Sequence, residues 1–213
     1  MSEKTKKAVL GRQVIATSSS LLAAVWIVAL ASIPSAQSYR DQLSAGAVED
    51  QIITAFDAMA VLIPITMIGS WIITSLWLKQ LHISATTANP RAIRLKRPWV
   101  FWSWIVPVVS LWFPKNLIED LLKSQGSDEA KTLIGKDTLT WWLTWVGFAL
   151  VNNVGIVSAF DAPEGYVPIR PELELAGACL LTGAYLVWIR IVKALDQSPL
   201  ASDINVFPTN NGS

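Results

Sequence analysis

The side chains with the clearest chemical potential are an acid and two amides inside apolar stretches. Asp57 lies early in an apolar run that begins at Ile52, and Asn152 and Asn153 lie within a later run. A carboxylate inside a membrane span is costly and marks a functional hypothesis, and Asn amides can donate to it. At similar depth, the three residues would form an intramembrane polar cluster for an ion, a proton or a polar headgroup. The alternative is that Asp57 reaches interfacial water or makes a satisfied contact between helices.

Other polar candidates have simpler interpretations. Glu119 and Asp120 are neighbours on an expected helix, where adjacent side chains diverge by about 100°, so we expect a solvated face. His82 is expected on a surface loop, and Cys179 as a small core residue. A lipid-modifying enzyme would require Glu119, Asp120 and His82 to converge. Without a nucleotide loop, a hydrolase motif or a metal-ligand set, we expect no enzyme activity, no cofactor and no metal.

The elements that must position these residues are apolar helices. The chain is 52% hydrophobic and 15% charged, which is typical of integral membrane proteins, and its net charge of +1 does not suggest nucleic acid as a partner. We predict an all-α polytopic membrane bundle with spans at 14–34, 52–78, 139–160 and 175–192. The single domain, 14–193, lies between a basic tail, 1–13, and a flexible tail, 194–213.

Two spans have features of their own. The first, 14–34, follows basic residues and resembles a signal peptide, but its length favours a retained span. Pro64 lies inside the second span and should kink it, because proline lacks an N–H and its ring clashes with the preceding turn.

The distribution of Lys and Arg predicts the topology. If residues 99–113 crossed the membrane, the 17 basic residues would divide ten inside to seven outside. If this stretch returns to the side it entered from, only Arg40 and Arg170 lie outside, and 17 − 2 = 15 lie inside. The second division fits the positive-inside rule better. It predicts four spans and both termini in the cytoplasm.

Length also favours a re-entrant or interfacial element over residues 98–125. A helix over 99–113 would reach only about 22 Å, short of a hydrocarbon core of about 30 Å. Pro107 interrupts its first half, and Pro114 can open a new amphipathic helix.

Basic and aromatic residues gather around this element. The basic residues can attract anionic lipid, and indoles prefer the headgroup level. Both sets therefore indicate docking of a lipid or a partner protein: Arg94, Lys96, Arg97, Trp99, Trp102, Trp104 and Trp112. The simpler interpretation is that the cations set orientation while the tryptophans fix depth.

The same stretch carries a recognisable pattern. Its residues are spaced as P-x5-W-x2-P-x2-S-L-x2-P, from Pro98 through Trp104, Pro107, Ser110 and Leu111 to Pro114. This pattern resembles the W-x-x-P-x-x-N-L-x-x-P core of the actinobacterial membrane family catalogued as domain of unknown function 4328. The resemblance extends over roughly residues 50–195. Ser110 stands where that family usually has Asn, and an Arg-rich continuation after the second span is missing. The resemblance implies an inner-membrane location and brings no known activity.

These observations favour a non-enzymatic membrane scaffold or regulatory subunit. Its Trp-rich element would dock membrane lipids, anionic ones in particular, another membrane protein or a second copy of the chain. The alternative is a small transporter or channel component that uses Asp57 with Asn152 or Asn153.

Overall fold

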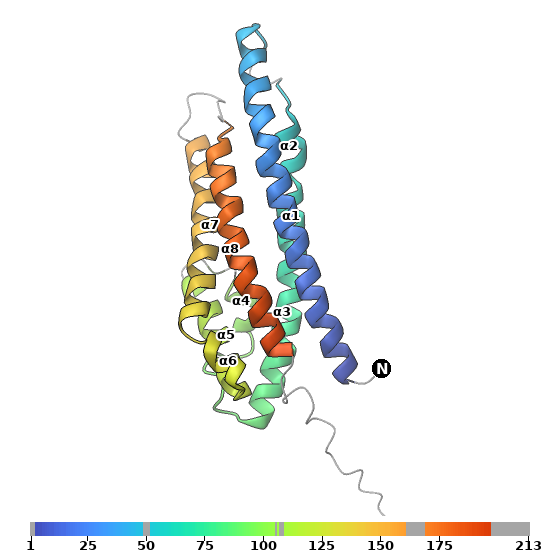
Figure 1. The fold of residues 1–213 in the computed structure, drawn as a ribbon, viewed down its shortest axis with the longest axis vertical. Coiled ribbons are helices and arrows are strands. Elements are labelled where there is room, and N and C mark those ends of the chain that lie inside the picture. The colour runs from blue at the N-terminus through green and yellow to red at the C-terminus, as the bar shows by residue number, and fades with distance from the viewer. Residues whose placement is uncertain (1–2, 49–51, 105, 107–108, 161–168, 197–213) are drawn as a thin grey trace, which may run out of the picture. The chain divides into compact units, whose positions relative to one another are not determined.

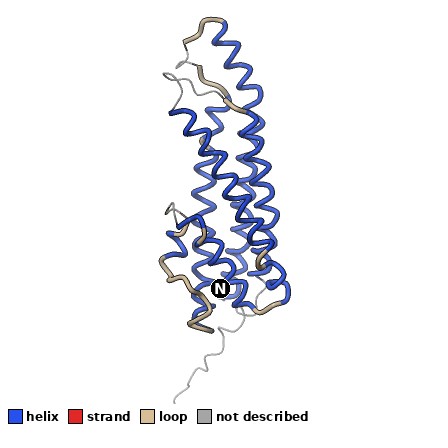
Figure 2. Tube along the Cα trace, turned by 90° about the vertical axis from the view of Figure 1, so that its left-hand side faces the viewer, coloured by secondary structure: helices blue, strands red, loops and turns tan. Residues whose placement is uncertain are grey.

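Helices form nearly all of the described chain (Figures 1 and 2). The computed structural model describes residues 3–48, 52–104, 106, 109–160 and 169–196. Its elements, in order, are α1 (Glu3–Ser44), α2 (Ala55–Ala60), α3 (Leu62–Ala88), α4 (Trp99–Trp102), the 3₁₀ turn η2 (Val109–Leu111), α5 (Phe113–Gln125), α6 (Asp128–Leu133), α7 (Lys136–Phe160) and α8 (Pro171–Asp196).

Within the part of the chain that the structure describes, three helical segments are long and apolar enough to cross a membrane: Val9–Ser44, Ala55–Ala88 and Pro171–Asp196. The prediction of an all-helical membrane protein is confirmed to this extent. Helix α7 contains the predicted third span but is not among these three. The fourth span and the re-entrant path of 98–125 therefore stay predictions.

The helices extend beyond the predicted spans. α1 includes ten residues after position 34, and α3 continues past Leu78 to Ala88 through residues that the sequence suggested were a loop. Span predictions count apolar residues only, whereas a helix continues wherever its backbone hydrogen bonds can form. The helical ends are polar extensions of apolar segments.

Pro64 accounts for a break in the second apolar segment. α2 ends at Ala60 and α3 begins at Leu62, so the helix is interrupted at Val61. Pro64 has no N–H to offer the carbonyl of Ala60, and its ring crowds that carbonyl. The predicted distortion is present, one turn before the proline itself.

The chain divides into two compact units. The first unit comprises Met1–Ile15, Trp71–Leu139 and Val187–Ser213, and the second comprises Ala16–Ser70 and Thr140–Leu186. Helices α1, α3, α7 and α8 contribute residues to both. Each unit has its own packing and is described separately.

Aliphatic and aromatic side chains from three helices form the core of the second unit: Leu21, Val25 and Ala29 of α1, Phe148 of α7, and Ala178 and Leu181 of α8. The indole N–H of Trp26 donates to the Thr182 hydroxyl at 3.0 Å, which fixes α1 against α8. The predicted first span is thus an integral part of this core.

Glycines let α7 and α8 approach closely, and the two helices lie side by side in Figure 1. A Cβ at Gly147 would lie 3.4 Å from Leu180, and one at Gly183 would lie 3.4 Å from Thr144. Small residues allow this close packing in membrane proteins.

Helix α5 provides the centre of the first unit. The apolar face of α5 is fully buried and consists of Leu117, Ile118, Leu121 and Leu122. Two apolar side chains of α6, Ala130 and Leu133, are buried as well. Near them the rings of Trp77 and Trp188 meet edge to face at 6.2 Å. Contrary to our expectation for Cys179, this residue of the second unit is exposed on α8, because the buried face there carries Gly177 and Ala178.

Candidate functional site

The two acids of α5 are buried, not solvated as the sequence suggested. Glu119 is 9% exposed and Asp120 is 3% exposed. Their side chains diverge as expected, but each turns toward a different partner inside the first unit. A buried carboxylate must be paired or hydrogen-bonded, and both are.

Asp120 holds the basic stretch that precedes the Trp-rich element. Its carboxylate accepts hydrogen bonds from the Arg94 backbone N–H at 3.1 Å and from Arg94 Nε at 3.0 Å, and it lies 2.9 Å from Arg94 Nη2. This hydrogen bonding, together with the charge of Asp120, raises the pKa of Arg94. Arg94 therefore anchors the loop instead of standing free for lipid.

Glu119 joins α5 to the start of α7. Its carboxylate lies 2.7 Å from Lys115 Nζ and accepts a hydrogen bond from the Thr138 hydroxyl at 3.0 Å. Burial by itself raises the pKa of Glu119, while the hydrogen bonds from Lys115 and Thr138 lower it. The charges of Lys115 and Lys123 lower it further, and the net result is a pKa below the ordinary value of 4.5.

His82 was expected on a surface loop, but it lies buried in the extension of α3. Its Nε2 lies 2.9 Å from the Leu95 carbonyl oxygen, within hydrogen-bonding distance. The stretch around residue 94 is thus held from two sides, by α5 through Arg94 and by α3 through Leu95. The three residues considered for an enzyme, Glu119, Asp120 and His82, each have a structural partner of their own.

Lys96 and Arg97 follow these anchors and remain exposed. Their carbonyl groups accept the backbone N–H groups of Trp99 and Val100, at 3.0 and 3.2 Å, in the first turn of α4. The backbone that carries the two cations is therefore fixed at the start of the helix that carries Trp102. Pro98 occupies the N-cap position of this helix.

The tryptophans of the element differ in exposure. Trp102 is 53% exposed and Trp112 is 44% exposed, whereas Trp99 packs edge to face on Phe113 at 5.1 Å. Trp104 is partly buried. Of these four tryptophans, only Trp102 and Trp112 present substantial indole surface. They are therefore the two tryptophans of the predicted docking residues that can contact a lipid or a partner protein.

The residues of the sequence pattern shape the chain path from α4 to α5. Ser110 donates its backbone N–H to the Val106 carbonyl at 2.8 Å, Leu111 is exposed in η2, and Pro114 lies buried in the first turn of α5. Pro107 lies outside the described residues. The described parts of the segment consist of short helical pieces, α4 and η2.

Asp57 has a local role in the second unit. It lies in the first turn of α2, is exposed, and its carboxylate accepts the Thr54 backbone N–H and hydroxyl, both at 2.8 Å. This arrangement is a capping box with an Asp at the third helical position. Asp57 lies in the first turn of the candidate span Ala55–Ala88, and both interpretations of it stay predictions.

Asn152 and Asn153 also have partners within their own helix. The Asn152 amide donates to the Phe148 carbonyl at 2.9 Å, and the Asn153 amide donates to the Ala149 carbonyl at 2.7 Å. Hydrogen bonding among the described residues thus accounts for Asp57, Asn152 and Asn153 one by one. Among the described residues, none of these hydrogen bonds joins Asp57 to Asn152 or Asn153.

The ion-pair network of α5 is what sequence reasoning missed. The spacing of Lys115, Glu119 and Lys123 at four-residue intervals is a signal that could have indicated paired charges on one helix face. No local signal relates Arg94 to Asp120, because 26 positions separate them.

Comparison with known proteins identifies a family. Residues 40–197 match a family described as a domain of unknown function, DUF4328. Neither curated proteins nor solved structures give a match.

Proposed function

Because the chain belongs to the DUF4328 family and carries three helices of membrane-spanning length, we propose that it is a non-enzymatic integral membrane scaffold or regulatory subunit. In this proposal it has four spans, with α7 as the third, and both termini face the cytoplasm. Residues 98–125 form the re-entrant or interfacial element, and its tryptophan side docks anionic lipid.

The observation that carries the proposal is that two exposed cations immediately precede the short helix that carries an exposed indole, on an ordered backbone. Lys96 and Arg97 accept the first backbone bonds of α4, while Trp102 ends that helix with more than half of its surface exposed. Lysine and arginine are attracted to anionic headgroups, and indole settles at the headgroup level. The combination fits an anionic membrane surface better than it fits a purely apolar partner.

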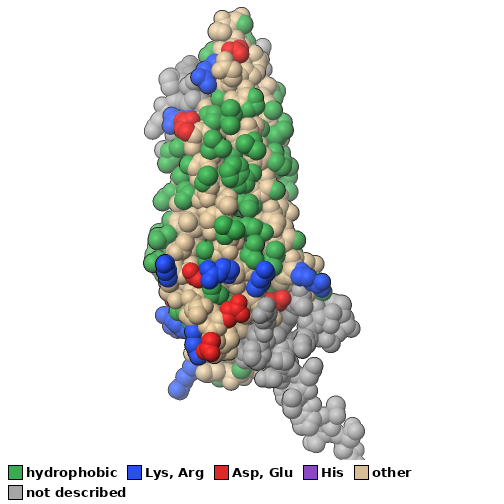
Figure 3. Space-filling model, in the orientation of Figure 1, with side chains coloured by type: hydrophobic (Ala, Val, Ile, Leu, Met, Phe, Trp, Pro, Cys, Tyr) green, Lys and Arg blue, Asp and Glu red, His purple; other side chains and the backbone are tan. Residues whose placement is uncertain are grey.

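The anchors of this element support the same proposal. The Arg94–Asp120 pair and the contact of His82 with Leu95 hold the basic stretch in a defined position before it reaches Lys96. Ordering a flexible surface on binding costs free energy, so a prearranged set of cations binds more tightly. Figure 3 shows further Lys and Arg side chains in a band across one face of the first unit, over α1, α7 and α8.

Hydrogen exchange in lipid nanodiscs tests the docking. We expect residues 96–113 to exchange more slowly when phosphatidylglycerol replaces phosphatidylcholine, by about fivefold per cation, which corresponds to about 1 kcal/mol. The double variant Lys96→Gln, Arg97→Gln should exchange at the same rate in both lipids. Lys131→Gln, on the exposed face of α6, should keep the difference between the lipids.

Equal protection in both lipids would contradict lipid docking. Protection that appears only with a co-purified membrane protein would assign the surface to a protein partner instead, and the lipid proposal would be wrong.

A further inference from the structure

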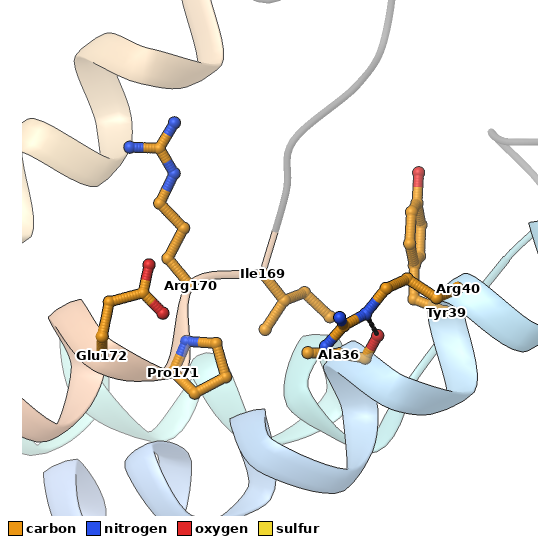
Figure 4. A pocket seen from close by; sticks show the side chains of 7 residues that line it. All are labelled: Ala36, Tyr39, Arg40, Ile169, Arg170, Pro171 and Glu172. Carbon is orange, nitrogen blue, oxygen red and sulfur yellow. Dashed lines mark hydrogen bonds between the residues drawn. The ribbon is translucent and has the colours of Figure 1, made fainter.

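A cavity of about 360 Å³ lies between the last turns of α1 and the start of α8, within the second unit (Figure 4). Ala36, Tyr39 and Arg40 line it from α1, and residues 169–172 line it from the other side. Its volume is within the range of small-ligand sites in proteins. No residue of the docking element described above contributes to it.

The lining is cationic on balance. Among the described residues that line it, Arg40 and Arg170 are basic and Glu172 is the single acid. Arg40 Nε donates to the Ala36 carbonyl at 3.0 Å, which fixes the guanidinium and leaves its terminal amino groups for a ligand. Figure 4 shows the guanidinium groups of Arg40 and Arg170 on either side of Ile169. In this view the Arg170 guanidinium points away from Arg40, but Arg170 is an exposed side chain with several rotatable bonds, so it would turn toward Arg40 to bind the same anion.

These are the two basic residues that the proposed topology puts outside. The other 15 of the 17 lie on the cytoplasmic side in that topology, and positive charge on the outer side is uncommon. Arg40 and Arg170 are 130 positions apart, yet they line the same cavity. A shared anionic ligand gives a reason for both exceptions.

The approach to the cavity along α1 is apolar. Leu30 is 55% exposed and Ile33 is 49% exposed. Ile33 precedes Arg40 by seven residues and so lies on the same helix face, and Leu30 lies one turn before Ile33. A ligand that contacts this whole surface has an apolar part on the helix and an anionic part at the arginines. That description fits a membrane lipid and does not fit a free anion.

We propose that this cavity binds the phosphate group of an anionic phospholipid, with Arg40 and Arg170 donating to its oxygens and the acyl chains lying along Leu30 and Ile33. Guanidinium groups suit this task because their N–H groups match the geometry of phosphate oxygens. The geometry of the cavity carries the proposal, and the topology adds that the lipid belongs to the outer leaflet.

The test is lipid binding by native mass spectrometry of the detergent-purified protein. The titration is carried out in the Lys96→Gln, Arg97→Gln background, so that the docking element does not contribute. Arg40→Gln and Arg170→Gln should each weaken binding of phosphatidylglycerol about tenfold, the loss expected for a hydrogen bond between charged groups. Lys131→Gln is the matched control and should leave the dissociation constant unchanged.

A variant that is expected to strengthen binding separates loss of ligand binding from misfolding. Glu172→Gln removes the one repulsive charge of the lining and should strengthen binding of phosphatidylglycerol about threefold. Phosphatidylcholine should bind more weakly than phosphatidylglycerol to the background variant.

Two outcomes would overturn the proposal. Equal dissociation constants for the background and both arginine variants would show that the cavity is not the site. Displacement of the lipid by inorganic phosphate at the same concentration would show that it is a small-anion site. Either result leaves docking by the Trp-rich element intact, since the two sites share no residue.

Discussion

At the scale of residues, the environments of the α5 acids are the reverse of what the sequence suggested. Glu119 and Asp120, expected in water, are buried and paired, whereas Asp57 caps the first turn of α2. A buried ion pair costs desolvation, and its clearest effect is to specify one arrangement of the elements that it joins. Here the pairs fix the basic stretch and the start of α7 against α5.

The lowered pKa of Glu119 predicts how its contribution depends on pH. Its carboxylate is ionised more readily in the folded protein than in the unfolded chain. The stabilisation is therefore complete above the ordinary pKa of 4.5 and is lost as the pH falls through the lowered value. We expect Glu119→Gln to be less stable than wild type by about 1–3 kcal/mol at neutral pH, with the gap closing in acid.

Unfolding midpoints in detergent, measured from neutral to acidic pH, check this prediction. Glu129→Gln on the exposed face of α6 is the control and should change stability by less than about 0.5 kcal/mol. A gap between wild type and Glu119→Gln that is constant over the whole pH range would show that the charge of Glu119 is not involved.

At the scale of elements, proline and glycine decide where helices begin and end. Pro64 separates α2 from α3, and Pro114 lies in the first turn of α5. Gly126 ends α5 in the left-handed conformation with φ of 67°, which is the usual helix stop at glycine. These boundaries place the tryptophans of α4 and η2 between the end of α3 and the proline-opened helix α5.

Gly126 and Gly69 offer a matched pair of substitutions. A Cβ at either position would meet no atom within 4 Å, so packing is not affected. Gly126→Ala should destabilise the protein by about 1–2 kcal/mol, because L-residues are disfavoured at positive φ. Gly69→Ala, in the interior of α3, should be neutral or stabilising by up to about 1 kcal/mol.

Thermal unfolding of the two variants side by side tests this element-level account. If Gly126→Ala and Gly69→Ala changed the unfolding midpoint equally, alanine at the left-handed position 126 would not be strained, and this account would be wrong.

At the scale of the whole molecule, the open question is how often the chain crosses the membrane. The four-span topology predicts that Glu172→Cys is labelled by an impermeant reagent on intact cells while Lys131→Cys is protected. Both are made in a Cys179→Ala background, since Cys179 is exposed, and Ser44→Cys serves as the labelled control. Protection reflects the side of the membrane on which each residue lies.

The reverse pattern, with Lys131→Cys labelled and Glu172→Cys protected, would show that 99–113 crosses. In that case the tryptophans and Lys96 would no longer share one membrane face, and the proposed docking surface would be wrong.

The amino-acid sequence alone determined the class of the protein. Hydropathy is a property of consecutive residues, so the apolar helices, the break near Pro64 and the pattern from Pro98 to Pro114 could be predicted without a structure. The pattern also led to the correct family, whose match covers residues 40–197.

Only the tertiary structure decided which charges are buried and which partners they have. Arg94 meets Asp120, His82 meets Leu95, and Arg40 shares a cavity with Arg170 because of the path of the chain between them. Helical spacing gives contacts over three or four residues and carries no information at larger separations. The ion pairs that hold the Trp-rich element, and the cavity proposed for lipid, depend on those longer separations.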